Sequence, residues 1–271
     1  MINKLLGKAV MTLAGRDDFA IPKHDSPLFE GVDWDNLPRH VAVIMDGNGR
    51  WANAQGQVRT VGHSAGAKVL KNILKTAIGL NLESLTVYAF STENWTRPAT
   101  EVKFLMNLIY GYLKQELQEM HEDNVRIHFI GDIAGLPDYL QEEIRKAEEL
   151  MKNNTGVKFN VATNYGGQDE MIRAIQKIAV SVQNGEITPA DIQKELIEDS
   201  LDTCGNPPVD LLIRTGGDHR LSNFLLWQVA YAEFYSAEVP WPEFSPKCFV
   251  KAIKEFNNRD RRFGGLNDDK K

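Results

Sequence analysis

Short apolar runs alternate with amphipathic segments along most of this chain. Residues 41–45 form an unbroken run rich in valine, which is typical of a strand buried on both faces. Further runs predict strands at 84–90, 125–130, 157–165, 209–215 and 235–239. Helical spacing of apolar residues predicts helices at 64–80, 100–122, 138–153, 169–183, 190–199, 222–232 and 246–259. This alternation predicts an α/β fold, as a single domain with a mostly parallel sheet of about six strands and helices on both faces.

The predicted helix at 100–122 is apolar on more sides than a surface helix requires. Its segment 102–113 reads V-K-F-L-M-N-L-I-Y-G-Y-L. A helix packed between the sheet and its neighbours, or at a dimer interface, would have this composition. The wall of an apolar tunnel would have it too, and the pattern alone leaves both interpretations open.

The first candidate site follows the strand at 41–45, where the sequence continues D-G-N-G-R-W. Ligands of open α/β sheets bind at the carboxyl ends of the strands, which is where Asp46 would lie. Gly47 and Gly49 would let backbone N–H groups approach an anion. A lone aspartate would repel a phosphate, so a diphosphate with Mg²⁺ between the two is the predicted ligand. A tight turn in which Asp46 caps the following helix explains this segment equally well.

The second predicted strand ends in S-T-E-N-W-T-R-P at 91–98, before a helix that begins near Pro98. This density of polar groups favours a binding loop. In a purely structural interpretation, Thr96 would cap the helix and Trp95 would pack against the core. That interpretation does not explain Asn94 and Arg97.

The strand at 209–215 runs into R-T-G-G-D-H-R-L-S-N at 214–223. Arg214 and Arg220 can each present a planar fork to a phosphate, and Ser222 can donate from the start of the next predicted helix. Ordinary surface ion pairs would also use these arginines. Two arginines around a glycine pair at a strand end nevertheless favour a second anion site.

Three basic side chains could close over the first anion site. Arg50, Arg59 and His63 lie on or just before the helix that follows residues 47–50. The chain therefore has two predicted phosphate pockets, each with arginines. Two anionic substrates and one metal ion imply group transfer between them and not simple hydrolysis.

Composition narrows the class of protein. With 271 residues, 42% of them hydrophobic, the chain can bury a full core, and no boundary favours two domains. No stretch reaches the ~18 apolar residues that a membrane span requires. The apolar stretch at the start of the chain is too short and too interrupted for a secretion signal. A cytoplasmic protein is therefore expected. Those first residues would suit either an amphipathic helix resting on a membrane surface or a solvated tail.

Charge and cysteine content exclude other classes. The net charge of −6 argues against a general nucleic-acid binder, so no nucleic-acid partner is expected. Cys204 and Cys248 are far apart and no histidines cluster, which indicates neither a disulfide framework nor a zinc site. A reducing compartment fits this content.

Three multi-residue motifs, in order, resemble those of one enzyme family. H-V-A-V-I-M-D-G-N-G-R-W-A at 40–52, F-S-T-E-N-W-T-R-P at 90–98 and D-L-L-I-R-T-G-G-D-H-R-L-S-N-F-L-L-W-Q at 210–228 are similar to those of the cis-prenyltransferases. A-Y-A-E-F-Y at 230–235 and R-R-F-G-G at 261–265 extend the likeness, which runs from about His40 to Gly265.

This resemblance implies chain elongation. Isopentenyl diphosphate would add repeatedly to an allylic diphosphate such as farnesyl diphosphate, each new double bond being cis. The product that the resemblance implies is a long-chain cis-polyprenyl diphosphate, namely undecaprenyl diphosphate, the precursor of the cell-wall lipid carrier. The growing tail needs a hydrophobic tunnel, which favours the tunnel-wall interpretation of 102–113.

The resemblance also assigns roles to residues. Asp46 would hold Mg²⁺ on the allylic diphosphate, and Glu233 resembles a second magnesium ligand. The leaving diphosphate would be cradled by Gly47, Asn48, Gly49, Arg50, Arg59 and His63, with Trp51 beside the bound substrate. The isopentenyl diphosphate clamp would comprise Arg97, Arg214, Arg220 and Ser222. Substrate contacts are expected as well from Ser91, Thr92, Glu93, Trp95 and Leu221.

Asn94 matches the position that the family assigns to proton removal from the condensing unit. An amide is a poor base, so orienting a water, or letting the substrate diphosphate accept the proton, is physically easier. Asp218 stands where the family more often carries glutamate, which keeps the charge and shortens the reach.

The family is a homodimer in which a C-terminal R-x-G segment approaches the partner's site, and Arg262-Phe263-Gly264 fits that pattern. The predicted organisation is an N-terminal extension at 1–35, partly helical, a catalytic domain at 36–265 and a flexible tail at 266–271.

Two other functions compete with this one. M-D-G-N-G superficially resembles a phosphatase with an aspartate nucleophile, which would want a second acid where Asn48 stands. A non-catalytic subunit of a prenyltransferase complex would lose the metal aspartate or the binding arginines, and this chain has all of them.

Overall fold

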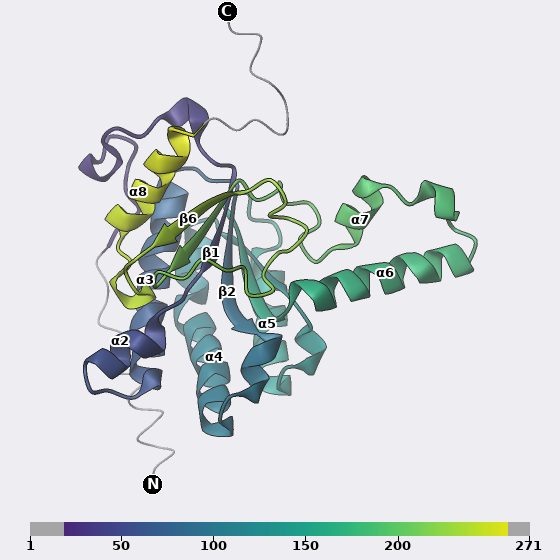
Figure 1. The fold of residues 1–271 in the computed structure, drawn as a ribbon, viewed down its shortest axis with the longest axis horizontal. Coiled ribbons are helices and arrows are strands. Elements are labelled where there is room, and N and C mark those ends of the chain that lie inside the picture. Colours follow the sequence, from purple (N-terminus) through teal and green to yellow (C-terminus); the bar gives the residue numbers. More distant parts are fainter. Residues whose placement is uncertain (1–18, 260–271) are drawn as a thin grey trace, which may run out of the picture.

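The computed structural model describes residues 19–259 as one α/β domain built on a single sheet (Figure 1). The strands are β1 (His40–Ile44), β2 (Ser84–Ser91), β3 (Arg126–Ile130), β4 (Lys158–Tyr165), β5 (Leu211–Thr215) and β6 (Glu233–Ala237). They are hydrogen-bonded in the order β3-β4-β2-β1-β5-β6, and every pair is parallel. The predicted fold class is confirmed.

Helices fill the connections between the strands. They are α2 (Asn48–Ala54), α3 (Arg59–Gly79), α4 (Ala99–Glu122), α5 (Asp138–Met151), α6 (Gly167–Gln183), α7 (Lys194–Ser200) and α8 (Pro246–Asn257). In Figure 1, α6 and α7 project to one side of the sheet. The short helix α2 was not predicted as a separate element.

Side-chain alternation along the strands sends residues to two cores. On β1, Val41 and Val43 belong to the larger core, whereas Ala42 and Ile44 belong to a smaller one. Buried residues of α3, α4, α5 and α8 fill the larger core. The smaller core is closed by the segment 221–232, which follows β5.

The predicted helix at 222–232 is wrong, because this segment is a series of turns. Ser222, Asn223 and Leu225 have φ angles of 51°, 61° and 48°, in the left-handed region that interrupts a right-handed helix. Phe224 and Leu225 are fully buried. The apolar spacing of this segment therefore records burial against the sheet and not helical periodicity.

The described part of the N-terminal extension lies against α8. Residues 19–35 contain η1 (Pro27–Phe29) and the start of η2 (Trp34–Asn36), both 3₁₀ helices. Phe29 is buried in the larger core, and the Nδ2 of Asn36 donates to the backbone carbonyl of Asn257. The expectations for residues 1–18, for Arg262-Phe263-Gly264 and for the tail at 266–271 lie outside the described residues. Within 19–259, no helix combines the length and apolar character that crossing a bilayer requires.

Candidate active site

Three loops far apart in sequence meet at the carboxyl edge of the sheet. They follow β1, β2 and β5, which are neighbours in the order β2-β1-β5. A cavity of about 510 Å³ lies between them. It is lined by Ile44, Met45, Asp46, Tyr88, Ser91, Glu93, Asn94, Arg97, Arg214, Arg220, Ser222 and Asn223. The loops that the sequence singles out separately thus form one site.

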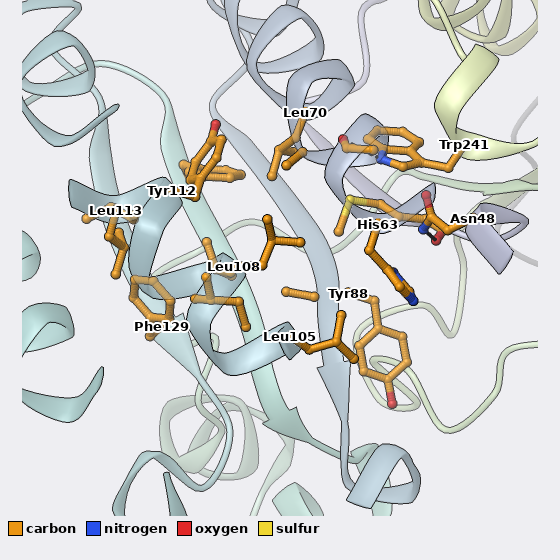
Figure 2. A pocket seen from close by; sticks show the side chains of 18 residues that line it. Asn48, His63, Leu70, Tyr88, Leu105, Leu108, Tyr112, Leu113, Phe129 and Trp241 are labelled. Atoms are coloured by element: carbon orange, nitrogen blue, oxygen red, sulfur yellow. Dashed lines mark hydrogen bonds between the residues drawn. The ribbon is translucent and has the colours of Figure 1, made fainter. Parts of the chain in front are cut away.

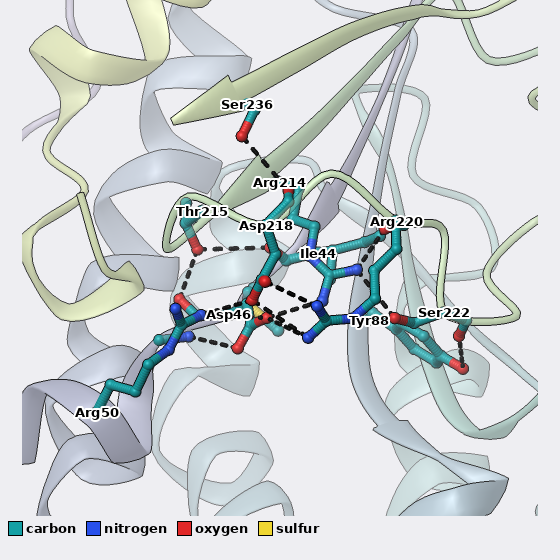
Figure 3. A network of polar contacts seen from close by, with 12 residues as sticks. Ile44, Asp46, Arg50, Tyr88, Arg214, Thr215, Asp218, Arg220, Ser222 and Ser236 are labelled. Carbon is teal, nitrogen blue, oxygen red and sulfur yellow. Dashed lines mark hydrogen bonds and ion pairs between the residues drawn. The ribbon is translucent and has the colours of Figure 1, made fainter. Parts of the chain in front are cut away.

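The carboxylate of Asp46 lies among three arginines (Figure 3). Its Oδ2 is 2.8 Å from Arg214, 3.6 Å from Arg50 and 3.9 Å from Arg220. Asp218 bridges the outer two, at 2.7 Å from Arg50 and 2.7 Å from Arg220. Hydrogen bonding from Arg220 holds the pKa of Asp218 below its usual value. Three guanidinium groups face two carboxylates, so the cluster has a positive charge in excess and favours an anion.

The turn after β1 depends on Gly47. Its φ is 96°, and a Cβ there would lie 2.7 Å from the Cβ of Pro240. Its N–H donates to Oδ1 of Asp46 at 2.6 Å. Gly47 itself is the N-cap of α2, and no side chain caps that helix end. Asp46 is therefore not a helix cap, and its Oδ2 is left to the arginine cluster.

The loop after β2 is a 3₁₀ helix, η3 (Thr92–Thr96), fixed at both ends. A capping box joins Ser91 to Asn94, whose Oδ1 accepts from the backbone N–H of Ser91 at 3.2 Å. The indole N–H of Trp95 donates to Oδ1 of Asn164 at 2.7 Å, and its ring meets Phe90 edge-on. Thr96 donates to the carbonyl of Glu93 and does not cap α4.

Glu101 joins the second loop to the start of α3, and the sequence did not reveal this link. Its Oε1 lies 3.0 Å from Arg97, 3.4 Å from Arg59 and 3.5 Å from His63. Burial would raise the pKa of Glu101, but the charges of Arg59 and Arg97 outweigh burial and lower it. Burial lowers the pKa of His63 to about 4. One feature of the sequence could have indicated this contact. Glu101 lies in the first helical turn after Pro98, four residues beyond Arg97, which is the spacing of an i,i+4 ion pair.

Asn223 links the second and third loops and was also missed. Its side-chain amide donates to Oε1 of Glu93 at 3.0 Å and accepts from the backbone N–H of Gln168 at 2.9 Å. The preceding residue, Ser222, accepts from Arg214 at 2.9 Å. The turn at 222–223 thus holds the Ser222 hydroxyl against Arg214, the arginine that contacts Asp46.

An apolar cavity of about 130 Å³ adjoins the polar one (Figure 2). The two share Met45 and Tyr88 in their linings. Asn48 and His63 line the apolar cavity at the same end as Tyr88, and Leu113 and Phe129 lie at the other end. The α4 side of it consists of Leu105, Leu108, Ile109, Tyr112 and Leu113. The segment predicted to be broadly apolar therefore lines a cavity as well as the core.

Some predicted site residues lie outside both cavities. Trp51 donates to Glu243 at 2.9 Å, Thr92 donates to Asp169 at 3.3 Å, and Leu221 packs against the smaller core. A Cβ on Gly49 would lie 2.8 Å from the guanidinium carbon of Arg59, so Gly49 lets that arginine approach α2.

The structure does not bring Glu233 to Asp46. Glu233 begins β6 and pairs in register with Leu211, at the amino end of the parallel sheet. Its carboxylate is 2.9 Å from Arg259. Asp46 follows the opposite end of β1, beside Arg214, so the two carboxylates form no common metal site within this chain. Among the described residues, no three histidine, cysteine, aspartate or glutamate side chains gather in a way that could hold a metal ion.

Comparison with known proteins identifies the family. A family model described as "Putative undecaprenyl diphosphate synthase" matches residues 44–264. The chain belongs to this cis-prenyltransferase family. An isoprenyl transferase of Prochlorococcus marinus is 46% identical to it over 244 residues, which are 90% of each chain. The farnesyl-diphosphate-specific ditrans,polycis-undecaprenyl-diphosphate synthase of Escherichia coli K12 is 49% identical over 84% of this chain and 90% of the relative.

Solved cis-prenyltransferase structures share the fold. Lavandulyl diphosphate synthase from Lavandula x intermedia, in complex with dimethylallyl diphosphate, superposes with a TM-score of 0.83 at 37% identity, over 85% of this chain and 99% of that one. A probable undecaprenyl diphosphate synthase from Campylobacter jejuni gives a TM-score of 0.71 at 36% identity, over 84% and 99%.

Proposed function

We propose that this cis-prenyltransferase condenses isopentenyl diphosphate units with farnesyl diphosphate and releases a long-chain cis-polyprenyl diphosphate, undecaprenyl diphosphate. The observation that carries the proposal is the junction of two unlike cavities at Met45 and Tyr88. One is lined by arginines that suit diphosphates, and the other is lined by apolar side chains that suit a prenyl tail. The names of the bacterial relatives supply the primer and the product.

Arg97, Arg214, Arg220 and Ser222 form the proposed clamp for isopentenyl diphosphate. All four line the polar cavity. Arg214 is nearly buried, and its Nε–H has no hydrogen-bond partner among the described residues, so it can donate to one more acceptor. The residues from Gly47 to Arg50, with Arg59 and His63, would hold the allylic diphosphate. Tyr88 and Asn48 would then lie where the diphosphate meets its prenyl chain.

Asp46 fits a magnesium ligand. Mg²⁺ is commonly held by one or two carboxylates, several waters and substrate phosphates, so one hard oxygen donor beside an anion site suffices. The ion, when bound, neutralises charge on the departing diphosphate. We propose Asp46 as the ligand; Glu233, the second predicted ligand, pairs with Arg259 and does not reach Asp46 of the same chain.

The reaction joins carbon 4 of isopentenyl diphosphate to carbon 1 of the allylic partner as the allylic carbon–oxygen bond breaks and a proton leaves carbon 2. The arginines stabilise the diphosphate that departs. Asn94 lines the cavity, and its Oδ1 is engaged by Ser91 N–H, so its NH₂ group is the part free to orient substrate or water. The proton would pass to a water or to the diphosphate and not to the amide.

Assembly as a homodimer is part of the proposal. β6 is an edge strand of the sheet, and Phe234 on it is 40% exposed. An exposed edge with an apolar side chain favours pairing with another chain. Because the product is a lipid, we also propose a peripheral contact with the membrane surface to which it is delivered.

Radiolabelled isopentenyl diphosphate tests the proposed function. The purified protein, with farnesyl diphosphate and Mg²⁺, should incorporate label into a butanol-soluble product that elutes with undecaprenyl standards on reverse-phase chromatography after dephosphorylation. If no label is incorporated, the alternative function, a non-catalytic subunit of a prenyltransferase complex, would be favoured. Release of phosphate from a simple phosphomonoester would instead favour the phosphatase.

A further inference from the structure

A cluster of four charged side chains joins α3 to α4 beyond the apolar cavity. Lys71 is 2.7 Å from Glu116 and 2.7 Å from Glu119, and Lys75 is 2.6 Å from Glu119. These four residues are called the α3–α4 clasp below. The side chains of Lys71, Glu116 and Lys75 are only 18%, 16% and 12% exposed. Neither the sequence motifs nor the proposed chemistry gives this cluster a role.

The clasp adjoins the end of the apolar cavity that lies away from the polar site. Leu70, which precedes Lys71, and Tyr112, one helical turn before Glu116, both line the cavity. Tyr112 also borders a small hollow of about 10 Å³ among the clasp side chains. Figure 2 shows Tyr112 and Leu113 at the end of the cavity opposite His63 and Tyr88. A tail that grows inward from the polar site therefore approaches the clasp last.

The cavity is bracketed by charged links between the same two helices. At the mouth, Glu101 of α4 contacts Arg59 and His63 of α3. At the far end, the clasp joins them again. Glu101 and Glu116 are roughly 22 Å apart along α4 at the helical rise of 1.5 Å per residue. Between the two links, the described side chains of α3 and α4 that line the cavity are apolar, apart from the phenol of Tyr112.

Separating the helices at the clasp is unfavourable for a definite reason. Glu119 is 41% exposed, but Lys71, Glu116 and Lys75 have little access to water, so parting the helices leaves these three charges poorly solvated and without their partners. Burial would lower the pKa of Lys71, but its hydrogen bonds to Glu116 and Glu119 outweigh burial and raise it. The Nζ of Lys75 also donates to the carbonyl of Phe19 at 2.8 Å, which adds a further attachment.

We propose that the α3–α4 clasp limits the length of the product by preventing α4 from moving away from α3 at the far end of the cavity. The inference rests on the proposed function. A tail that has filled the cavity can gain room for another isoprene unit if the two helices part, and the clasp opposes that motion. The clasp residues touch no reacting atom, so they act on product length and not on the condensation step.

The test is product length in clasp variants. The quadruple variant K71M/K75M/E116Q/E119Q removes all four charges with similar side-chain sizes and leaves the net charge unchanged. We expect its initial rate of isopentenyl incorporation to stay within about twofold of that of the unsubstituted protein. The main product should lengthen by at least one isoprene unit on reverse-phase chromatography.

Two further variants keep the test decisive. The double variant K75M/E119Q retains the Lys71–Glu116 pair and should give a smaller shift toward longer products. Circular dichroism reports whether each variant folds. If the quadruple variant does not fold, the product length of K75M/E119Q decides the question. The matched control, K146M/E142Q, removes an ion pair of 2.6 Å that is more than half exposed on α5, and should leave the product unchanged.

The outcomes separate the two proposals. Folded, active clasp variants with an unchanged product, or with shorter products, would overturn the role of the clasp and leave the proposed function standing. Failure of the unsubstituted protein to incorporate isopentenyl diphosphate would overturn the proposed function and the clasp together.

Discussion

At the scale of single residues, Asp46 lies among arginines and has no second acid at position 48 beside it. Its Oδ2 faces Arg214, Arg50 and Arg220, which favour the charged form of any anion nearby. A phosphatase of the aspartate type would need a second acid at position 48. The amide of Asn48 donates instead to the carbonyl of Met45 at 3.0 Å, so it does not serve as one.

Replacement of Asp46 tests this assignment. Asp46→Ala should lower isopentenyl incorporation by about 10²–10³-fold, because the site loses its hard oxygen donor for the metal. The fold should be retained, but the midpoint of thermal unfolding should fall, since the nearly buried Arg214 loses an ion-pair partner. Asp46→Asn is the matched control for the hydrogen bond from Gly47, and it should be nearly as inactive. Normal turnover in either variant would contradict the metal assignment.

His63 predicts a pH dependence of stability. Burial, followed by the charge of Arg97, lowers the pKa of folded His63 to about 4 from an ordinary value of about 6.5. Between these values the unfolded chain binds a proton that the folded chain does not, so the stabilisation present above pH 6.5 is lost as the pH falls toward 4. His40, whose pKa burial also lowers to about 4, adds a second such contribution.

Urea unfolding across this pH window measures the effect. His63→Gln should reduce the slope of the free energy of unfolding against pH by up to about 1.4 kcal/mol per unit, which corresponds to one proton. The contribution of His40 should remain in the variant. A slope equal to that of the unsubstituted protein would show that His63 is not held neutral by the fold.

At the scale of elements, the spacing of apolar residues predicted most strands and helices to within a few residues. It failed at 222–232, where three positive φ angles interrupt the helix that the spacing indicated. Burial on one face produces the same spacing in a turn-rich segment, so periodicity alone could not separate the two. The loop at 91–97 was recognised by its composition, yet residues that it contacts, among them Asn164 and Glu101, lie on other elements.

The hydrogen bond from Trp95 to Asn164 can be removed while an aromatic side chain is kept at position 95. Trp95→Phe keeps an aromatic ring against Phe90 and loses the N–H donor. Because Asn94 precedes Trp95, we expect kcat to fall by roughly tenfold through misplacement of the amide, with stability lowered by about 1 kcal/mol. Tyr139→Phe, which removes a hydrogen bond to Asn107 between α4 and α5, is the control and should keep full activity. Equal kcat values in the two variants would contradict a positioning role for this attachment.

At the scale of the whole molecule, the strand order creates the site. Because β1 lies between β2 and β5, the loop after β5 lines one cavity with two loops that precede it by more than a hundred residues. The same arrangement places the apolar cavity against the polar one, so an anionic head and an apolar tail can be held at once. The edge position of β6 leaves one side of the sheet open to another chain.

Truncation tests the proposed dimer. A chain that ends at Asp260 lacks Arg262-Phe263-Gly264 and should lose about two orders of magnitude in isopentenyl incorporation, because the partner's site would lack a group that positions substrate. Light scattering with size-exclusion chromatography would report the oligomeric state, and circular dichroism would report the fold. A truncated monomer with full activity would refute the contribution of this segment.

The sequence by itself determined the α/β alternation, the three polar loops and the family, because strand burial, glycine turns and guanidinium chemistry are local properties. Only the tertiary structure decided that Asp46 faces arginines and is not a helix cap, that Glu233 lies at the opposite end of the sheet, and that Glu101 and Asn223 tie the second loop to α3 and to the third loop. It also decided that charged links bracket the apolar cavity between α3 and α4. These relations join residues on different elements, and a local pattern carries no information about which elements become neighbours.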